Sequence, residues 1–515
     1  MSRGINPSSI EAFLPDTGMY GSEKAYVSTP TDLLQITNAE EIFSVDLYTG
    51  ENRVSAVLAT ATKGEVYDHS KEICDRLNNS VLEDIRTVTV RGHQVISSKI
   101  KRATGETEYT LGFSVKLGDT VNELYSFWNI EQYPSGDYYN FQIWGSSFSQ
   151  VFTLSNYILD KFKEIKPLNS IALEDVVPPV FVSSGYYKNG NIHLNIINKI
   201  KATSMNFEAV LSKTEMSNKI NMSEVINLKG TWKDEVIIPS GQLFDIGFSL
   251  STSSSKQQDA LYLADGPWGI DYLKENVNVS AFTIENNDED ISEGIYQIER
   301  EPSVNGQVKG TINLFRHVLA GDQTLDVSDY ESIQFKIQNT KPVEVILVQQ
   351  GLIDWDNRLR ITIPVNESEK SYTISFKDFL DKSGNSGNIK DIKTIVFSLQ
   401  GDYVTYTPFT IAVNDVAFGL KANQFDENLT ESNKILAIPN PINSSGNIYF
   451  TSDQNEDVTL NIYNYLGQLV YKTKDATRIG QNLIPINKEG LNSGMYICKV
   501  ISNNKKYTSL KLLIN

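Results

Sequence analysis

Residues 330–348 read YESIQFKIQNTKPVEVILV. Two runs of β-branched and aromatic residues, 330–337 and 343–348, flank a short polar turn. From Ile333 to Ile337 apolar and polar residues alternate, and this period of two is typical of a β-strand with one buried face. The stretch therefore predicts two strands joined by a turn.

The same pattern extends over almost the whole chain from Ala25 onward. Runs such as 42–48, 87–90 and 108–115 are separated by Gly, Asn, Asp and Ser turns at intervals of about ten residues. This spacing favours antiparallel sandwiches over parallel sheets with crossover helices. We therefore predict an all-β protein of tandem antiparallel β-sandwiches, jelly-roll-like and immunoglobulin-like, with few short helices. Two helices are expected, at residues 68–77 and 153–165.

The composition excludes several classes of protein. Of the 515 residues, 40% are hydrophobic and 10% aromatic, which is too apolar for a disordered chain. No apolar run is long enough for a transmembrane helix. The 46 basic and 63 acidic residues give a net charge of −17, which repels nucleic acid and anionic lipid. Two distant cysteines, Cys74 and Cys498, are too few for a disulfide scaffold or a zinc cluster.

Three composition shifts divide the chain. Pro178 and Pro179 stop the first unit, because two prolines cannot continue a ladder or a helix. Residues 285–293 hold many acids and are interpreted as a solvated linker, although clustered carboxylates could also bind calcium. A third break is the polar stretch 423–433. The expected units span residues 20–176, 177–285, 294–420 and 434–515.

The last unit differs from the others in charge and motif. Residues 435–515 hold eight basic and five acidic residues, whereas the rest of the chain is strongly acidic. Residues 458–464 alternate and lead through a Leu-Gly-Gln turn into residues 469–471, which predicts a hairpin in which Gly467 supplies a positive φ. The unit contains no catalytic constellation.

These residues resemble the type A C-terminal sorting domain of type IX secretion cargo. The matching positions, in the order and spacing of that family, are Asn440, Pro441, Gly467, Gly494, Tyr496, Lys499 and Lys511. The alternative interpretation of this unit is an immunoglobulin-like stabilising module.

The resemblance implies a location. Such cargo crosses the inner membrane on a cleaved signal and is then exported by the type IX machinery, which would be a partner of this domain. We therefore expect a secreted protein, or one on the outer-membrane surface of a Gram-negative bacterium. The chain begins MSRGINP, without the apolar core of a secretory signal, and we interpret Met1 as an added start residue that replaces a removed signal.

The third unit resembles the galactose-binding-like jelly rolls, which include several families of carbohydrate-binding modules. The resemblance is carried by the strand 330–337, the segment 374–379 with its short helical turn, and the closing strand 413–418. In these jelly rolls a carboxylate of the closing strand often helps to hold a structural calcium ion, which the resemblance places at Asp415. Calcium is the one cofactor that we expect.

Sugar recognition needs an aromatic surface for the ring and planar polar groups for the hydroxyls. The loop 354–358 supplies both between two strands, and a second loop, 401–408, adds two tyrosines. The alternative is that Trp355 caps the core and the charged residues form a surface pair of little energetic value. The candidate carbohydrate-binding residues are Asp354, Trp355, Asp356, Arg358, Tyr403 and Tyr406.

The first two units hold secondary candidates. Residues 125–133 and 138–144 are predicted to be two aromatic strands joined by a turn, with Gln142 and Trp144 on one face of the second. In the second unit a Gly-Pro-Trp-Gly turn is expected to present the indole of Trp268. Each of these aromatic residues could equally belong to a core.

No catalytic residue is assigned, because the four histidines are isolated in sequence and no nucleophile elbow, zinc helix or phosphate loop is present. The leading hypothesis is a secreted multi-domain protein that binds polysaccharide or a surface glycan. One alternative is an extracellular carbohydrate-active lyase or hydrolase on a β-sandwich, with Asp265 and Asp271 as its acids. The other is a structural adhesin whose domains are spacers.

Overall fold

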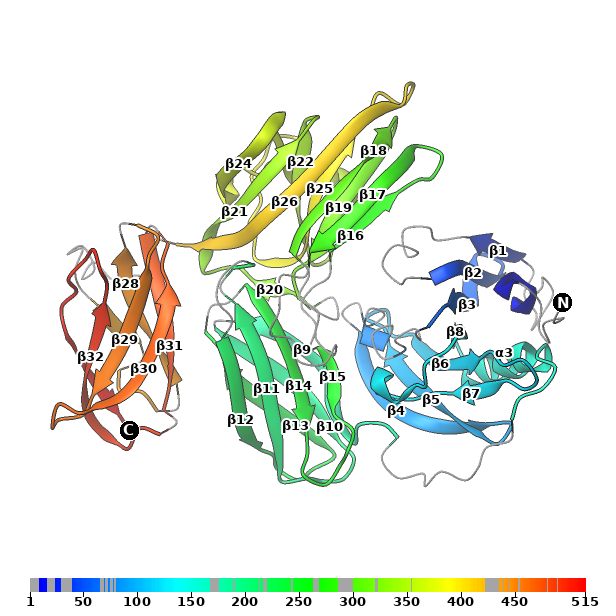
Figure 1. The fold of residues 1–515 in the computed structure, drawn as a ribbon, viewed down its shortest axis with the longest axis horizontal. Helices are drawn as coiled ribbons and strands as arrows, with labels where there is room; N and C mark the ends of the chain where they lie inside the picture. The colour runs from blue at the N-terminus through cyan, green and yellow to red at the C-terminus, as the bar shows by residue number, and fades with distance from the viewer. Residues whose placement is uncertain are drawn as a thin grey trace.

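The computed structural model describes residues 9–15, 24–28, 39–166, 176–262, 268–285, 300–421 and 435–515, except for positions 65–68 and several others inside these ranges. Strands make up 62% of it and helices 7%, in several antiparallel sheets, so the predicted all-β class is confirmed. Figure 1 shows the units following one another, with the C-terminal unit at one end. No helix within the described ranges is long and apolar enough to span a membrane.

The N-terminal unit is one antiparallel sheet of eight strands in the order β1-β2-β3-β8-β6-β5-β4, with β7 paired to β6. The helix α3 packs on this sheet through Val151, Leu154 and Ile158. The elements are η1 Ile10–Phe13, β1 Lys24–Ser28, β2 Ala39–Thr49, β3 Asn52–Thr62, β4 Val81–Val90, β5 His93–Lys101, β6 Thr107–Lys116, β7 Glu123–Tyr125, η3 Ile130–Gln132, β8 Tyr138–Gly145 and α3 Phe148–Asp160.

Two local predictions in this unit differ from the structure. The second expected helix starts at Phe148 rather than Thr153, because Ser147 and Gln150 form a reciprocal capping box at its N-terminus. Residues 125–133 are not one strand, since the Asn129 side chain accepts from Glu131 N and starts the turn η3. The helix expected at 68–77 lies partly outside the described residues.

The second unit contains two facing sheets. One is β12-β11-β14-β15, and the other is formed by β13, β10 and β9. Phe207 and Phe248 stack at 5.4 Å between ring centroids inside the core. The strands are β9 Val180–Lys188, β10 Asn191–Asn198, β11 Ser204–Ser212, β12 Ile220–Asn227, β13 Lys233–Pro239, β14 Asp245–Ser251 and β15 Asp259–Tyr262.

The third unit is a sandwich in which the sheet β17-β18-β26-β21-β24 packs against β16, β19, β25, β22 and β23. Phe335 of β21 meets Phe397 of β25 edge to face at 5.2 Å. Its elements are β16 Trp268–Tyr272, β17 Val277–Glu285, β18 Arg300–Val308, β19 Thr311–His317, β20 Leu325–Asp326, β21 Tyr330–Asn339, β22 Val343–Gln349, η5 Trp355–Asn357, β23 Leu359–Ile363, β24 Asn366–Ser375, η6 Phe376–Asp378, β25 Asp391–Gln400 and β26 Thr407–Leu420.

Strand pairing does not follow the boundary expected between residues 285 and 294. β16 and β17 precede that boundary in sequence, yet they pair with β19 and β18 of the third unit. The short strand β20 also pairs with both β9 and β25, so one nine-stranded sheet runs through both units. The acidic stretch therefore connects two adjacent strands of one sheet.

Buried charges join the same two units. Asp245 accepts hydrogen bonds from Arg300 and Arg316, and Glu215 lies 3.2 Å from Arg316 Nε. The other oxygen of Glu215 accepts from Val416 N at 3.1 Å. Because all four charged side chains are buried, each depends on the others for compensation.

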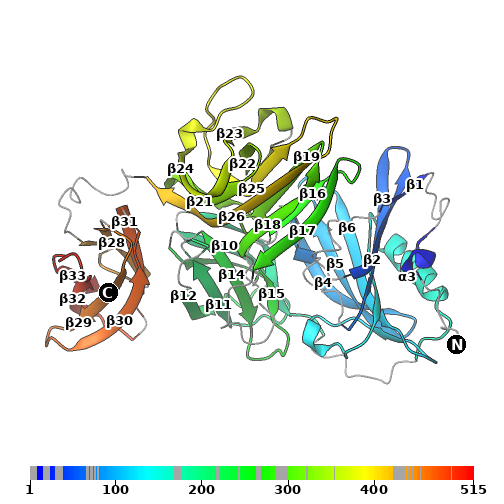
Figure 2. The same cartoon turned by 45° about the horizontal axis from the view of Figure 1, so that its top comes forward.

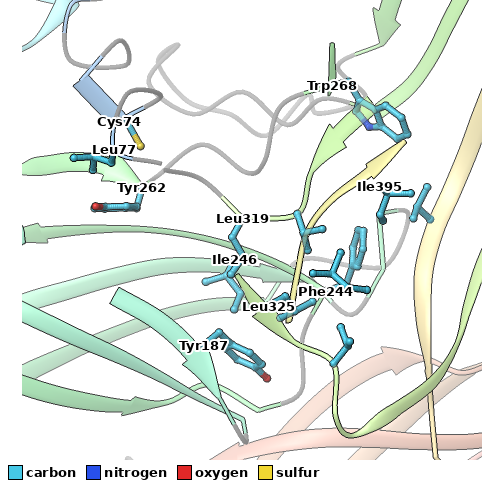
Figure 3. Close-up of a cluster of buried hydrophobic side chains, with 14 of the residues drawn as sticks. Cys74, Leu77, Tyr187, Phe244, Ile246, Tyr262, Trp268, Leu319, Leu325 and Ile395 are labelled. Carbon is cyan, nitrogen blue, oxygen red and sulfur yellow. The ribbon is translucent and has the colours of Figure 1, made fainter. Parts of the chain in front are cut away.

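Apolar side chains join the first three units. Figure 3 shows Cys74 and Leu77 of the first unit in one cluster with Tyr262 of the second and Leu319 and Ile395 of the third. The units therefore form a single packed body rather than separate modules.

The C-terminal unit has its own core and two sheets, β27-β28-β31 and β30-β29-β32-β33. The predicted hairpin is confirmed as β29–β30, with Gly467 at φ 79°. The strands are β27 Ile435–Ile438, β28 Ser445–Ser452, β29 Asp457–Tyr463, β30 Leu469–Ala476, β31 Gly480–Asn487, β32 Gly494–Ile501 and β33 Leu510–Ile514.

Candidate functional site

A row of polar side chains crosses the outer face of the third unit. Asp271 of β16 lies opposite Asn313 of β19, which in turn lies opposite Ser398 of β25. Ser398 lies opposite Glu344 of β22, and Glu344 lies opposite Thr362 of β23. Figure 2 shows these five strands side by side. Residues opposite each other on neighbouring strands share a face. We call this surface the polar sheet face.

The alternation of β19 explains why the row points outward. Ile312, Leu314 and Arg316 are buried on the inner side, while Asn313 and Phe315 are partly exposed. On the same outer side, Phe315 lies opposite Val396. The face therefore combines a polar row with an adjacent apolar one.

Two polar atoms of this face have no hydrogen-bond partner among the described residues. Asn313 Nδ2 donates to Asp271 Oδ2 at 3.3 Å, which leaves Asn313 Oδ1 without a donor. Arg360 Nε pairs with Glu344 Oε1 at 2.9 Å, and Arg360 Nη1 has no acceptor. A buried polar atom without a partner costs about 1–3 kcal/mol. Both atoms are almost inaccessible to solvent, so a ligand hydroxyl reaches them only when the side chains that cover them move.

The predicted Trp355 loop borders this face. Asp354 caps the turn η5 by accepting from Asp356 N at 3.0 Å, and Trp355 is 45% exposed. The Arg358 guanidinium lies 5.3 Å from the centroid of the Trp355 ring and donates to Glu344 Oε2 at 2.9 Å. Arg358 thereby connects the indole to the polar row.

The two acids of that loop are engaged within the protein. The Asp354 side chain holds the turn, and Asp356 pairs with Lys382 at 2.7 Å. Lys382 keeps the pKa of Asp356 below its ordinary value through a hydrogen bond and its charge. Arg358 also directs its guanidinium nitrogens at Glu344 and Trp355 O, so Trp355 is the loop residue best placed to touch a ligand.

Tyr403 borders the opposite end of the polar sheet face. It follows β25, is 55% exposed, and its hydroxyl lies 2.8 Å from Thr311 Oγ1, which is two residues before Asn313 on β19. Tyr406 lies apart, since its hydroxyl donates to Glu275 O at 2.8 Å and Lys309 lies over its ring. The structure thus places Tyr403, rather than Tyr406, beside the face.

The secondary aromatic candidates are buried. Trp144 and Gln142 point into the interior of the first unit, where Gln142 hydrogen-bonds His69. Trp268 is the first residue of β16, only 1% exposed, and its indole N–H donates to Glu215 Oε1 at 2.9 Å. The expectation that a turn presents Trp268 to solvent is wrong, because this buried carboxylate holds the indole inside.

Asp415 faces cations. Its Oδ1 accepts from Arg478 Nη2 at 2.7 Å, and its Oδ2 lies 3.9 Å from Lys336 Nζ. Two positive charges oppose binding of a calcium ion at this carboxylate. The described part of the chain also holds no group of three acidic, histidine or cysteine residues arranged for a metal.

The sorting-motif residues have structural places in the C-terminal unit. Asn440, followed by Pro441, donates to Lys511 O at 3.0 Å and accepts from Leu513 N at 2.8 Å, which ties the start of the unit to its last strand. Tyr496 donates to Asn492 O, and Lys499 lies over the ring of Tyr463. Gly494 is the first residue of β32.

Sequence reasoning missed Asn313, Glu344 and Arg360. The alternation TINLFRH at 311–317 could have indicated an outward Asn313. That these residues share a row with Asp271 depends on strand order, which alternation does not show.

The comparisons with known proteins match the C-terminal unit to a family. Residues 437–515 match the model of the secretion system C-terminal sorting domain, so the resemblance noted above is confirmed. A sorting domain of this kind indicates a secreted protein. No curated protein matches the chain.

Several solved structures match part of the chain. The family 11 carbohydrate-binding module of a cellulosomal cellulase from Clostridium thermocellum is 16% identical, over 30% of this chain and 88% of that one, with a TM-score of 0.22. A family 29 module complexed with cellulohexaose is 12% identical, over 31% and 96%, with a TM-score of 0.18. The glycoside hydrolase domain of Endo-D from Streptococcus pneumoniae is 8% identical, over 48% and 40%, with a TM-score of 0.22. At these TM-scores the matches say nothing about what this chain binds.

Proposed function

We propose that this secreted protein binds a polysaccharide or surface glycan on the polar sheet face of its third unit, and that the type IX machinery exports it through the C-terminal sorting domain. The body then serves as a binding protein, and no catalytic role is assigned to it.

The observation that carries the proposal is the polar row between two exposed aromatic rings. Asn313 Oδ1 and Arg360 Nη1 lie on the same face without a hydrogen-bond partner among the described residues, and sugar hydroxyls would bind them once the side chains covering them shift. Trp355 and Tyr403 lie at opposite ends of the strands that form this face. Trp355 precedes β23, whose first residue, Leu359, pairs with Leu347 of β22. Tyr403 follows Gln400, the last residue of β25, at the other end. An extended sugar chain can contact both rings while its hydroxyls meet the row.

The surrounding groups make the face rigid before a ligand arrives. Glu344 is held by Arg358 and by Arg360, each at 2.9 Å. Asp271 in turn holds Asn313. Side chains fixed in this way lose little conformational entropy on binding.

The test is binding of the full chain to a panel of neutral polysaccharides, with Trp355→Ala and Asn313→Ala as variants. Tyr465→Ala is the matched control, since Tyr465 is 79% exposed but lies in the sorting domain. We expect saturable binding that weakens about tenfold in the two face variants, as lost stacking or one lost hydrogen bond of about 1.4 kcal/mol would give. The control should bind as the native protein does.

Two outcomes would count against the proposal. Equal binding by all variants would place the site elsewhere. Shortened polysaccharide chains in the supernatant would show that the protein is an enzyme.

A further inference from the structure

A cavity lies between the first and second units, away from the polar sheet face. Its volume is about 690 Å³, which is in the size range of ligand pockets. One wall comes from β4, β5 and β6, and the other from β9, β10 and the start of β13. We call this cavity the interunit cleft.

The two walls are held together by specific contacts, so the cleft is a fixed feature. Lys199 of the second unit pairs with Asp84 of the first at 2.5 Å and also donates to Ile85 O. Nearby, the indole N–H of Trp128 donates to Gln258 O at 2.8 Å across the same boundary.

The cleft has an excess of positive charge in an acidic protein. It is lined by two acids, Glu83 and Asp84, and by four basic residues, namely Arg86, Lys99, Lys199 and Lys233. The whole chain, by contrast, has a net charge of −17. A local excess of cations against such a background attracts an anionic group to this place rather than to the rest of the surface.

Ion pairs neutralise only part of the positive charge in the interunit cleft. Lys99 pairs with Glu83 at 2.7 Å, and Lys199 pairs with Asp84. Arg86 lies farther from Asp84, at 3.8 Å, and Lys233 is exposed on β13. Arg86 and Lys233 therefore carry the charge that a ligand can use.

An aromatic ring stands beside these cations. Trp232 lines the cleft and is 51% exposed, although it is one of the largest apolar side chains of the protein. On the opposite wall, Tyr109 lies next to Lys99 in strand register. An exposed indole offers its face to the C–H side of a sugar ring, and the adjacent cations suit a carboxylate or sulfate on that sugar.

We propose that the interunit cleft binds an anionic oligosaccharide, with a sugar ring on Trp232 and its carboxylate or sulfate at Lys233 and Arg86. This site is separate from the polar sheet face and takes a different class of ligand. A failure of the function proposed above would therefore leave this proposal unaffected, and the reverse also holds.

The experiment is calorimetric titration of the full chain with three tetrasaccharides: a tetragalacturonate, a sulfated carrageenan tetrasaccharide, which carries no carboxylate, and neutral cellotetraose. The variants are Trp232→Ala and Lys233→Glu, both at exposed positions, and Trp355→Ala is the control because it alters the polar sheet face alone. The two anionic probes distinguish carboxylate from sulfate as the recognised group.

We expect at least one anionic probe to bind, and its affinity to fall about tenfold in Trp232→Ala and Lys233→Glu but not in Trp355→Ala. Binding should also weaken as the salt concentration rises. Failure of both anionic probes to bind would overturn the proposal. So would cellotetraose binding that Trp232→Ala and Lys233→Glu weaken as strongly, or an anionic-probe affinity that Trp355→Ala lowers and Trp232→Ala leaves unchanged.

Discussion

Arg478 of the sorting domain donates a hydrogen bond of 2.7 Å to Asp415 of the third unit. The same nitrogen donates to Thr214 of the second unit at 2.8 Å. One side chain of the sorting domain thus contacts the body where its two sandwiches meet. Asn487 adds a second link by donating to Glu224 at 2.9 Å.

Replacing Arg478 should loosen the sorting domain from the body. Because Arg478 and Asp415 are partly exposed, we expect Arg478→Ala to cost no more than about 1 kcal/mol of stability. The larger effect should be on arrangement, with a greater radius of gyration in small-angle scattering. Lys474→Ala, which removes another cation of the same domain, should leave the radius unchanged. An unchanged radius in Arg478→Ala would show that this contact does not hold the domain.

Buried His69 should make stability depend on pH. Burial lowers the pKa of His69 to about 3, against a weaker opposing effect of its hydrogen bond with Gln142. Between pH 6.5 and 3 His69 is protonated in the unfolded chain and neutral in the folded chain. Stability is therefore lost as the pH falls from 6.5 towards 3. Relative to His69→Gln, the free energy of unfolding should fall by about 1.4 kcal/mol per pH unit in that window. The comparison is made by urea unfolding at several pH values.

A constant difference between native protein and His69→Gln across that window would contradict this account. The comparison with the variant is necessary because burial also raises the pKa of Asp259, to about 6. An acid whose pKa is raised in the folded state stabilises that state at low pH, and this contribution is lost as the pH rises from 3.8 to 6. This opposite contribution is present in both proteins and cancels in the difference.

The buried ionic cluster should tolerate no loss of a partner. Arg316→Met leaves Asp245 and Glu215 with less compensation, and we expect a loss of about 3–5 kcal/mol in denaturant unfolding. Arg53→Met is the matched control, because the Arg53–Asp46 pair is solvent-exposed and should cost less than about 1 kcal/mol. Similar small losses in both variants would show that the cluster does not hold the second and third units together.

Local sequence pattern was sufficient for the strands but not for their partners. The alternation over 330–348 correctly predicts two strands, now β21 and β22. Yet β21 pairs with β24 and β26, while β22 pairs with β23 and β25 of the other sheet. Nothing in a period of two distinguishes these arrangements, because every strand of a sandwich shows it.

The candidate site, like the strands, could be predicted only where its features arise from residues close together in the sequence. The composition of the loop around Trp355 predicts an exposed indole next to Arg358, and both are found there. Trp268 is held inside by its hydrogen bond to Glu215, and Asp415 is paired with Arg478. Both of these partners are distant in sequence. Contacts of that range arise from the packing of whole units, so residue types in one stretch cannot indicate them.

The most direct test of the central claim is the dissociation constant of the best-binding neutral hexasaccharide for the native chain and for Asn313→Ala. Asn313 lies between Asp271 and Ser398 in the polar row, and its Oδ1 has no partner within the described structure. We predict an affinity about tenfold lower in the variant, with an unchanged unfolding midpoint. An unchanged affinity would contradict the claim that this face binds the glycan.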